Sequence, residues 1–216
     1  MRSIVYIDGF NLYYGACRHP GRRWLDLSAL CERLLPNDEI LEIAFCTANV
    51  KQDASNPGKQ DRQRLYHRAL KTIPNLEIHL GRFIPKRVKG RLVDHLDGEP
   101  QERVVETFEE KGTDVNIASL LLKDGFEGRY ESAVLISNDG DLKMPVHIVR
   151  SDLDLPVTVI NPILAAAKRR SAALSPTPLP ANANFIQLRA SDVEESQFPE
   201  TVISPKGAPL RRPPTW

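Results

Sequence analysis

The chain has 216 residues, of which 41% are hydrophobic and 26% charged, so it can bury one substantial core and remain in solution. Lysine and arginine number 29 against 28 acids, and a net charge of +1 excludes a generally polycationic binder. No run approaches the roughly 18 apolar residues of a membrane span, and the first residues lack the pattern of a signal peptide. We therefore expect a cytoplasmic protein without a membrane partner, in which the scattered cysteines are reduced.

The first part of the chain alternates between strand-like and helix-like segments. Residues 3–8 form a short β-branched run that ends in an acid, which is typical of a strand buried on both faces. Residues 26–35 place leucines at helical spacing, and Pro36 ends the helix. The next predicted elements are a strand at 39–50, a helix at 58–73 and a strand at 76–83.

The alternation pauses at 86–110, where we predict a hairpin that turns at Asp97-Gly98. The elements predicted beyond it are a helix at 113–124, a strand at 132–136, a helix at 142–149 and a strand at 156–160. This order predicts an α/β fold, with an open, mostly parallel sheet and helices on both of its faces.

The composition changes toward the C-terminus. Residues 161–216 hold nine of the 17 prolines, which predicts loops and extended chain. Apolar residues such as Phe185, Leu188, Phe198 and Trp216 remain in this part. We therefore predict a domain of residues 1–174 and a Pro-rich extension, 175–216, that packs on the domain or on a second subunit.

Several aspartates follow the predicted strands or open a helix. Asp8 ends the first strand, Asp139 and Asp141 follow the strand at 132–136, and Asp114 opens the helix predicted at 113–124. Ligands of open α/β sheets bind beyond the carboxyl ends of the strands. If the two strands are neighbours, these acids meet at one edge.

Such a cluster is electrostatically costly. Two unit charges about 4 Å apart repel each other by about 4 kcal/mol at an effective dielectric constant of about 20. A divalent cation removes that cost, and carboxylates without a Cys or His set suit Mg²⁺ or Mn²⁺ rather than zinc. Taken singly, each acid has a plainer interpretation, namely a turn residue for Asp8, a helix-start acid for Asp114 and a loop for Asn138–Asp141.

Three motifs resemble one family. They are Ile-Asp-Gly-Phe-Asn-Leu-Tyr at 7–13, Lys-Gly-Thr-Asp-Val at 111–115 and Ser-Asn-Asp-Gly-Asp-Leu at 137–142. Together they resemble the NYN domains, which are PIN-like, metal-dependent ribonucleases and include a bacterial group without an assigned function. The resemblance covers roughly residues 1–162, and position 138 is Asn where many relatives have Gly.

The resemblance implies a role for each matching residue. Asp8, Asp114 and Asp139 would bind the metal, and Asp141 would be a fourth acid, acting directly or through water. Asn11 would hold Asp8 or a phosphate oxygen. Lys111 would neutralise a phosphate, and Ser137 would order a water. A buried structural hydrogen bond is the alternative for Asn11 and Ser137.

A basic stretch without acids follows the third strand and is expected to bind RNA phosphates. Its residues are Arg82, Lys86, Arg87, Lys89 and Arg91. Tyr13, Tyr14 or Trp24 could stack on an unpaired base. The alternative is that the charges are solvated surface and the aromatic residues core.

The resemblance therefore implies an endoribonuclease that cleaves single-stranded RNA with water activated by one or two Mg²⁺ or Mn²⁺ ions. Water attack does not need the 2′-hydroxyl, so single-stranded DNA is chemically possible. One alternative is a non-catalytic RNA-binding protein on the same fold, and another is a phosphatase with an aspartyl intermediate. A homodimer is a further expectation, because related domains often pair.

Overall fold

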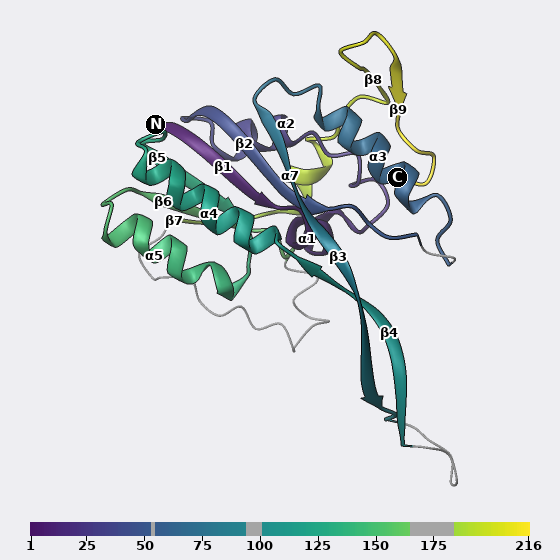
Figure 1. The fold of residues 1–216 in the computed structure, drawn as a ribbon. Helices are drawn as coiled ribbons and strands as arrows, with labels where there is room; N and C mark the ends of the chain where they lie inside the picture. The colour runs from purple at the N-terminus through teal and green to yellow at the C-terminus, as the bar shows by residue number, and fades with distance from the viewer. Residues whose placement is uncertain (53–54, 94–100, 165–183) are drawn as a thin grey trace.

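The computed structural model describes residues 1–52, 55–93, 101–164 and 184–216 (Figure 1). Their main feature is a seven-stranded sheet in the order β4-β3-β2-β1-β5-β6-β7. Every neighbouring pair in it is parallel except β3 with β4. The predicted α/β class with a mostly parallel sheet is confirmed.

The strands of the main sheet are β1 (Arg2–Asp8), β2 (Glu39–Ala48), β3 (Leu76–Arg91), β4 (Glu102–Lys111), β5 (Ser132–Ile136), β6 (Val157–Asn161) and β7 (Asn184–Gln187). The helices are α1 (Gly9–Leu12), the π-helical η1 (Tyr13–Cys17), α2 (Leu27–Leu34), α3 (Lys59–Leu70), α4 (Thr113–Phe126), the 3₁₀ turn η2 (Gly140–Leu142), α5 (Lys143–Ser151) and α7 (Ala190–Glu194). A second sheet pairs β8 (Thr201–Ile203) with β9 (Pro209–Arg211).

The sheet separates two hydrophobic cores because side chains alternate along β1. Val5 and Ile7 pack in one core with residues of α2 and α3. Ile4 and Tyr6 pack in the other core with residues of α4 and α5. Helices therefore cover both faces, and the strand ends are left to form an edge between the two helical layers.

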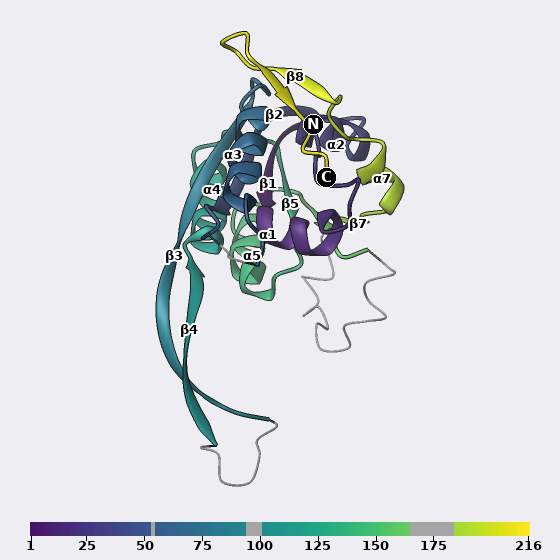
Figure 2. The same cartoon turned by 90° about the vertical axis from the view of Figure 1, so that its right-hand side faces the viewer.

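Strand β3 continues well beyond the predicted end at residue 83. It pairs antiparallel with β4 from Arg82 opposite Lys111 to Arg91 opposite Glu102. Figure 1 and Figure 2 both show this ribbon projecting from the body of the molecule. The arms of the predicted hairpin are confirmed, while its turn at Asp97-Gly98 lies outside the described residues.

Two helical turns, α1 and η1, follow β1 where no element was predicted. Asp8 caps α1, because its side chain accepts hydrogen bonds from the backbone N–H groups of Phe10 and Asn11. The segment is short and begins with glycine, so no helical repeat marks it in the sequence. It nevertheless fixes the residues that follow the first acid.

The C-terminal residues pack on the same core as the sheet. Strand β7 pairs with β6, and Leu188 and Phe198 are buried in the core that contains α2. Trp24, which we considered as a stacking residue, is wholly buried, and its indole N–H donates to the carbonyl oxygen of Pro199. That stacking role for Trp24 is therefore wrong. The predicted boundary after residue 174 lies outside the described residues and stays a prediction.

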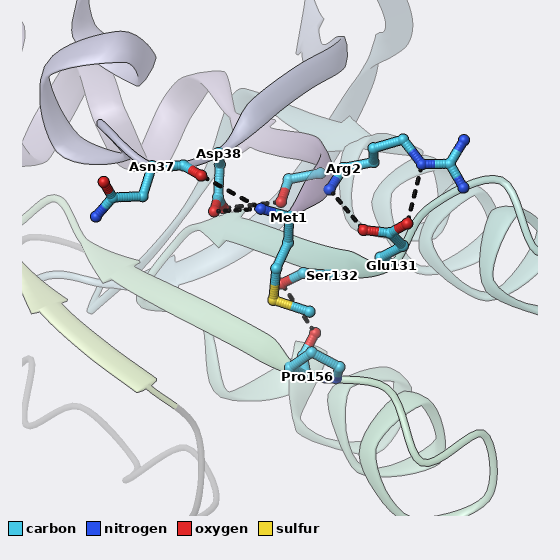
Figure 3. A network of polar contacts seen from close by, with 8 residues as sticks. Met1, Arg2, Asn37, Asp38, Glu131, Ser132 and Pro156 are labelled. Atoms are coloured by element: carbon cyan, nitrogen blue, oxygen red, sulfur yellow. Dashed lines mark hydrogen bonds and ion pairs between the residues drawn. The ribbon is translucent and has the colours of Figure 1, made fainter.

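Polar contacts hold together the opposite edge of the sheet, where the strands begin (Figure 3). The N-terminal ammonium group of Met1 lies 3.3 Å from Asp38, and Arg2 binds Glu131 through its backbone N–H and its side chain. The hydroxyl of Ser132 donates to the carbonyl oxygen of Pro156. The two ion pairs are exposed and each worth about 1 kcal/mol or less, so they align the strand starts without forming a site.

None of the helices in the described ranges has the length and apolar character needed to cross a membrane.

Candidate active site at the carboxyl edge of the sheet

Asp8 is the most constrained of the predicted acids. It ends β1 and is only 4% exposed. Its Oδ1 accepts the backbone N–H groups of Phe10 at 3.1 Å and Asn11 at 2.9 Å. Its Oδ2 accepts the hydroxyl of Ser137 at 3.1 Å. Two elements therefore fix the carboxylate, namely α1 on its own segment and the loop after β5.

The loop after β5 brings two more acids to the same edge. Strands β1 and β5 are parallel neighbours, with Ile7 opposite Ile136, so the residues after them lie side by side. The Ser137 hydroxyl accepts the backbone N–H of Asp139 at 3.1 Å, and Asp139 caps η2 by accepting the N–H of Asp141 at 2.9 Å. One wholly buried serine thus links Asp8 to Asp139.

Asp114 reaches the site from the start of α4. Gly112 precedes the helix with φ of 106°, a left-handed conformation that glycine adopts without strain. Asp114 lines a shallow pocket of about 380 Å³ together with Glu110, Lys111 and Asp141. No hydrogen-bond donor reaches its carboxylate from the described part of the chain, so both oxygens are available to a ligand.

The carboxylates influence one another electrostatically. Burial, followed by the charges of Asp8, Asp139, Glu110 and Asp141, raises the pKa of Asp114 to about 6. Burial also raises the pKa of Asp8, and the Asp139 charge adds to this, while the bonds from Asn11, Ser137 and Phe10 act in the opposite direction. The edge is thus a place where a negative charge is unfavourable and a cation is favoured.

Two residues near these acids were not predicted. Glu110 accepts the hydroxyl of Thr113 at 2.7 Å and its N–H at 3.2 Å, which secures the start of α4. In the sequence, the only feature that marks Glu110 as part of the site is its position four residues before Asp114. Cys46 lies opposite Asp8 on β2, and burial, with Asp8 and Asp114, raises the pKa of its thiol to about 12. That thiol is neutral and acts as packing.

The donor set fits a hard divalent cation. The carboxylate oxygens of Asp8, Asp139 and Asp114 still have lone pairs that accept no hydrogen bond from the described residues. Oxygen is the ligand atom that Mg²⁺ and Mn²⁺ prefer. Among the described residues, these three acids do not bring their oxygens within 4.8 Å of one another in all pairs. Oxygens around one Mg²⁺ are at most about 4.2 Å apart, so an ion would draw the side chains inward or reach some through water.

A different group of side chains meets that distance criterion. Ligand atoms of Glu42, Glu77 and His79, on β2 and β3, lie within 4.8 Å of one another, close enough for one divalent cation. Glu42 already accepts a hydrogen bond from Arg129 at 2.7 Å, which neutralises part of its charge. This group shares no residue with the predicted site.

Asn11 and Lys111 lie beside the acids, and the side chain of each already has a partner within the protein. The Asn11 side-chain oxygen accepts the backbone N–H of Asn138 at 3.1 Å, so Asn11 joins α1 to the loop after β5. Lys111 lines the Asp114 pocket, but its ammonium group lies 2.5 Å from Glu109. Glu109 also binds Lys86 at 3.1 Å.

The predicted basic stretch divides between the edge and the projecting hairpin. Arg82 is exposed at the base of the hairpin, opposite Lys111. Lys86, Arg87, Lys89 and Arg91 lie four to nine residues further along β3, or about 13–30 Å along the strand. The structure therefore brings Arg82 to the edge with the acids and carries the other four outward.

Comparison with known proteins gives three similarities. The sequence model described as "NYN domain" matches residues 2–179. The chain is 28% identical over 248 aligned positions to the 6-hydroxy-3-succinoylpyridine 3-monooxygenase HspA of Pseudomonas putida, an alignment that covers 100% of this chain and 75% of that protein. A crystal structure of a protein of unknown function from Vibrio parahaemolyticus is similar with a TM-score of 0.49 and 17% identity, over 87% of this chain and 92% of that one.

Proposed function

The chain belongs to the NYN domain family, whose fold is nuclease-like, and we propose on that premise that it is a metal-dependent endoribonuclease acting on single-stranded RNA. The observation that carries the proposal is the convergence of Asp8, Asp114, Asp139 and Asp141 at one sheet edge. Burial, followed by repulsion from these acids and Glu110, raises the pKa of Asp114 to about 6. A site that only bound phosphate would gain nothing from such an anionic cluster.

Asp8, Asp114 and Asp139 would hold Mg²⁺ or Mn²⁺, with Asp141 contributing directly or through water. When bound, the cation would activate water, neutralise the phosphate oxygens and stabilise the leaving oxygen. The oxygen–phosphorus bond to the attacking water forms as the bond to the 3′-oxygen breaks, which leaves 5′-phosphate and 3′-hydroxyl ends.

The protein's own residues would hold this site in place. Ser137 keeps Asp8 and Asp139 at a fixed separation through its two hydrogen bonds. Asn11 fixes the loop that carries Asp139 through the backbone N–H of Asn138. Arg82 at the hairpin base would attract an RNA phosphate to the same edge, with an affinity that falls as salt rises.

A second candidate function follows from the relative that is named a monooxygenase. Its alignment spans 100% of this chain at 28% identity, which favours an alternative in which this protein oxidises a small aromatic compound. That reaction would need O₂ and an external reductant. The acid cluster has no evident role in such an oxidation, so we rank the ribonuclease function first.

The test is cleavage of a 5′-labelled single-stranded RNA by wild-type protein and by Asp139→Asn, with Mg²⁺, Mn²⁺ or EDTA. We expect cleavage with either metal, none in EDTA, and a loss of at least about 100-fold in Asp139→Asn. Asp152→Asn, an exposed acid after α5, is the matched control and should cleave like the wild type.

Three other outcomes would contradict the proposal. RNA bound equally well in EDTA and never cut would favour a non-catalytic RNA-binding protein. Hydrolysis of nucleoside monophosphates in place of RNA would favour a phosphatase. Consumption of O₂ with a hydroxylated pyridine and a reductant, without RNA cleavage, would favour the oxidation reaction.

A further inference from the structure

A large aromatic cavity begins at the residue after Asp8. Its volume is about 520 Å³, and Gly9 and Phe10 of α1 form part of its wall. Further parts of the wall come from β2, α3 and the base of the β3–β4 hairpin, including Phe45, Tyr66 and Phe83. A volume of this size is within the range of about 300–1,000 Å³ typical of small-ligand sites.

The rings around the cavity are held in place by contacts with one another. Phe10 meets Phe83 edge to face with ring centres 5.7 Å apart, and Phe45 meets His67 in the same way at 6.4 Å. Burial, followed by Lys71, lowers the pKa of His67 to about 4, so that this ring is neutral at physiological pH. Rigid, uncharged rings form a surface on which any planar aromatic ligand can stack.

The charged side chains of the cavity all have one sign. Its lining includes Arg23, Lys51, Lys59 and Arg62, whereas none of the described lining residues is an Asp or a Glu. A cavity whose described charged side chains are all cationic therefore lies directly beside an acid-rich edge. Its chemistry suits a planar heteroaromatic ring attached to an anionic group, which is the chemistry of a nucleotide.

The cavity and the acids lie on opposite sides of the end of β1. Asp8 points to the same side of the sheet as Ile4 and Tyr6, which pack in the core with α4. Phe45 belongs to the core on the other side. Asp8 carries one of the acids and the next residue, Gly9, lines the cavity, so the two sites adjoin at the end of β1.

We propose that this cavity binds one unpaired base of the RNA, from a nucleotide adjoining the phosphate at the acids. This inference rests on the proposed ribonuclease function and deepens it. The RNA strand crosses the end of β1, with the scissile phosphate on the side of the acids and the neighbouring base turned into the cavity. A base within a duplex cannot enter, so the cavity selects single-stranded substrate.

Binding in EDTA tests the cavity separately from catalysis. Isothermal titration with AMP, UMP and ribose 5-phosphate compares ligands with and without a base. We expect both nucleotides to bind about tenfold more tightly than ribose 5-phosphate, since stacking on an aromatic ring is worth about that factor or more. We expect Phe108→Ala to remove most of this preference. Phe108 lines the cavity but is 48% exposed, so its truncation should leave the fold intact.

The matched control is Phe126→Ala at the end of α4, an exposed phenylalanine outside the cavity, which should bind like the wild type. Equal affinity for AMP and ribose 5-phosphate would overturn the proposal. An equal loss of nucleotide affinity in Phe108→Ala and Phe126→Ala would also overturn it. So would tight binding of nicotinate, a pyridine carboxylate, in place of the nucleotides.

Cleavage then tests the position of the base. In RNA that carries one abasic nucleotide next to the cut site, the wild type should cleave about tenfold more slowly. Phe108→Ala should show the same loss on intact RNA and no further loss on the abasic RNA. If the Phe108→Ala substitution and the abasic nucleotide reduce the cleavage rate additively, the proposal is overturned. Base-selective binding without any RNA cleavage would support base binding by the cavity and contradict the proposed ribonuclease activity.

Discussion

Asp114 carries the largest electrostatic cost among the predicted acids. Its pKa is raised from 3.8 to about 6 by burial first and then by the neighbouring carboxylates. In the folded protein it therefore holds a proton over a pH range in which the unfolded chain has released it. Its contribution to stability is full below pH 3.8 and is lost as the pH rises through about 6.

We accordingly expect Asp114→Asn to stabilise the metal-free protein. Above about pH 6 the gain should be about 1 kcal/mol, a figure reduced from the full linkage value because the side chain is partly exposed. Below pH 3.8 the gain should vanish, since both side chains are neutral. Urea unfolding in EDTA at pH 8 and pH 3.5 measures this, and equal stability of the two proteins at pH 8 would contradict it.

Ser137 is the residue that positions two acids at once. Ser137→Ala removes the donor to Asp8 and the acceptor for the Asp139 N–H, so we expect a loss of about 1–3 kcal/mol of stability. RNA cleavage at saturating Mg²⁺ should fall about tenfold or more, as for other partners of metal ligands. The matched control is Ser132→Ala, because that hydroxyl donates to Pro156 at the opposite edge (Figure 3). If the two variants cleave RNA equally well, Ser137 is not a positioning residue.

At the scale of the element, the first residue of α1, Gly9, packs closely against β2 directly after the end of β1. A Cβ atom on Gly9 would lie 2.8 Å from the Phe45 ring and 2.9 Å from the backbone oxygen of Cys46. Because a backbone atom cannot move aside easily, we expect Gly9→Ala to shift α1 and to cost about 1–3 kcal/mol. The shift would also displace Asp8.

Thermal unfolding of Gly9→Ala and Gly90→Ala checks this prediction. Gly90 lies on the hairpin with no atom within 4 Å of an added Cβ, so its substitution should change stability by less than about 0.5 kcal/mol. Equal melting temperatures of the two variants would show that α1 tolerates the added methyl group.

The elements that the sequence predicted best are those whose buried side chains form a clear apolar pattern, either continuous or periodic. Strand β5 was predicted with its observed bounds, 132–136, because all five of its residues are buried between two helical layers. Strand β3 was predicted as half its length, because beyond residue 83 nearly every side chain is exposed. Its backbone is held by β4, a partner that no local pattern reveals.

The same reasoning explains what could be foreseen of the site. The carboxyl-end rule brought Asp8 and Asp139 together because it depends only on strand direction and order. A buried structural hydrogen bond was one of the two predicted roles of Ser137, but the rule could not reveal its partners, the charge of Glu110 beside Asp114, or the aromatic cavity. Those features depend on side chains from several elements, whose distances the sequence does not contain.

On the scale of the whole molecule, the two edges of the sheet differ. The strand starts are tied by exposed ion pairs such as Arg2 with Glu131, while the strand ends gather the acids, the cavity and the hairpin base. Under the proposed ribonuclease function, the basic residues of β3 on the projecting hairpin would attract a long RNA toward that edge. Pairing of two copies stays a prediction, which sedimentation of the intact protein would test.

The central claim is that Asp8, Asp114 and Asp139 together form the divalent cation site. Titration with Mn²⁺, followed by the electron paramagnetic resonance of the free ion, measures this most directly in three proteins: wild type, Asp139→Asn and Glu77→Gln. We predict that Asp139→Asn weakens Mn²⁺ binding about tenfold or more, and that Glu77→Gln, which alters the separate group with Glu42 and His79, binds like the wild type. Unchanged binding in Asp139→Asn, with binding lost in Glu77→Gln, would contradict the account.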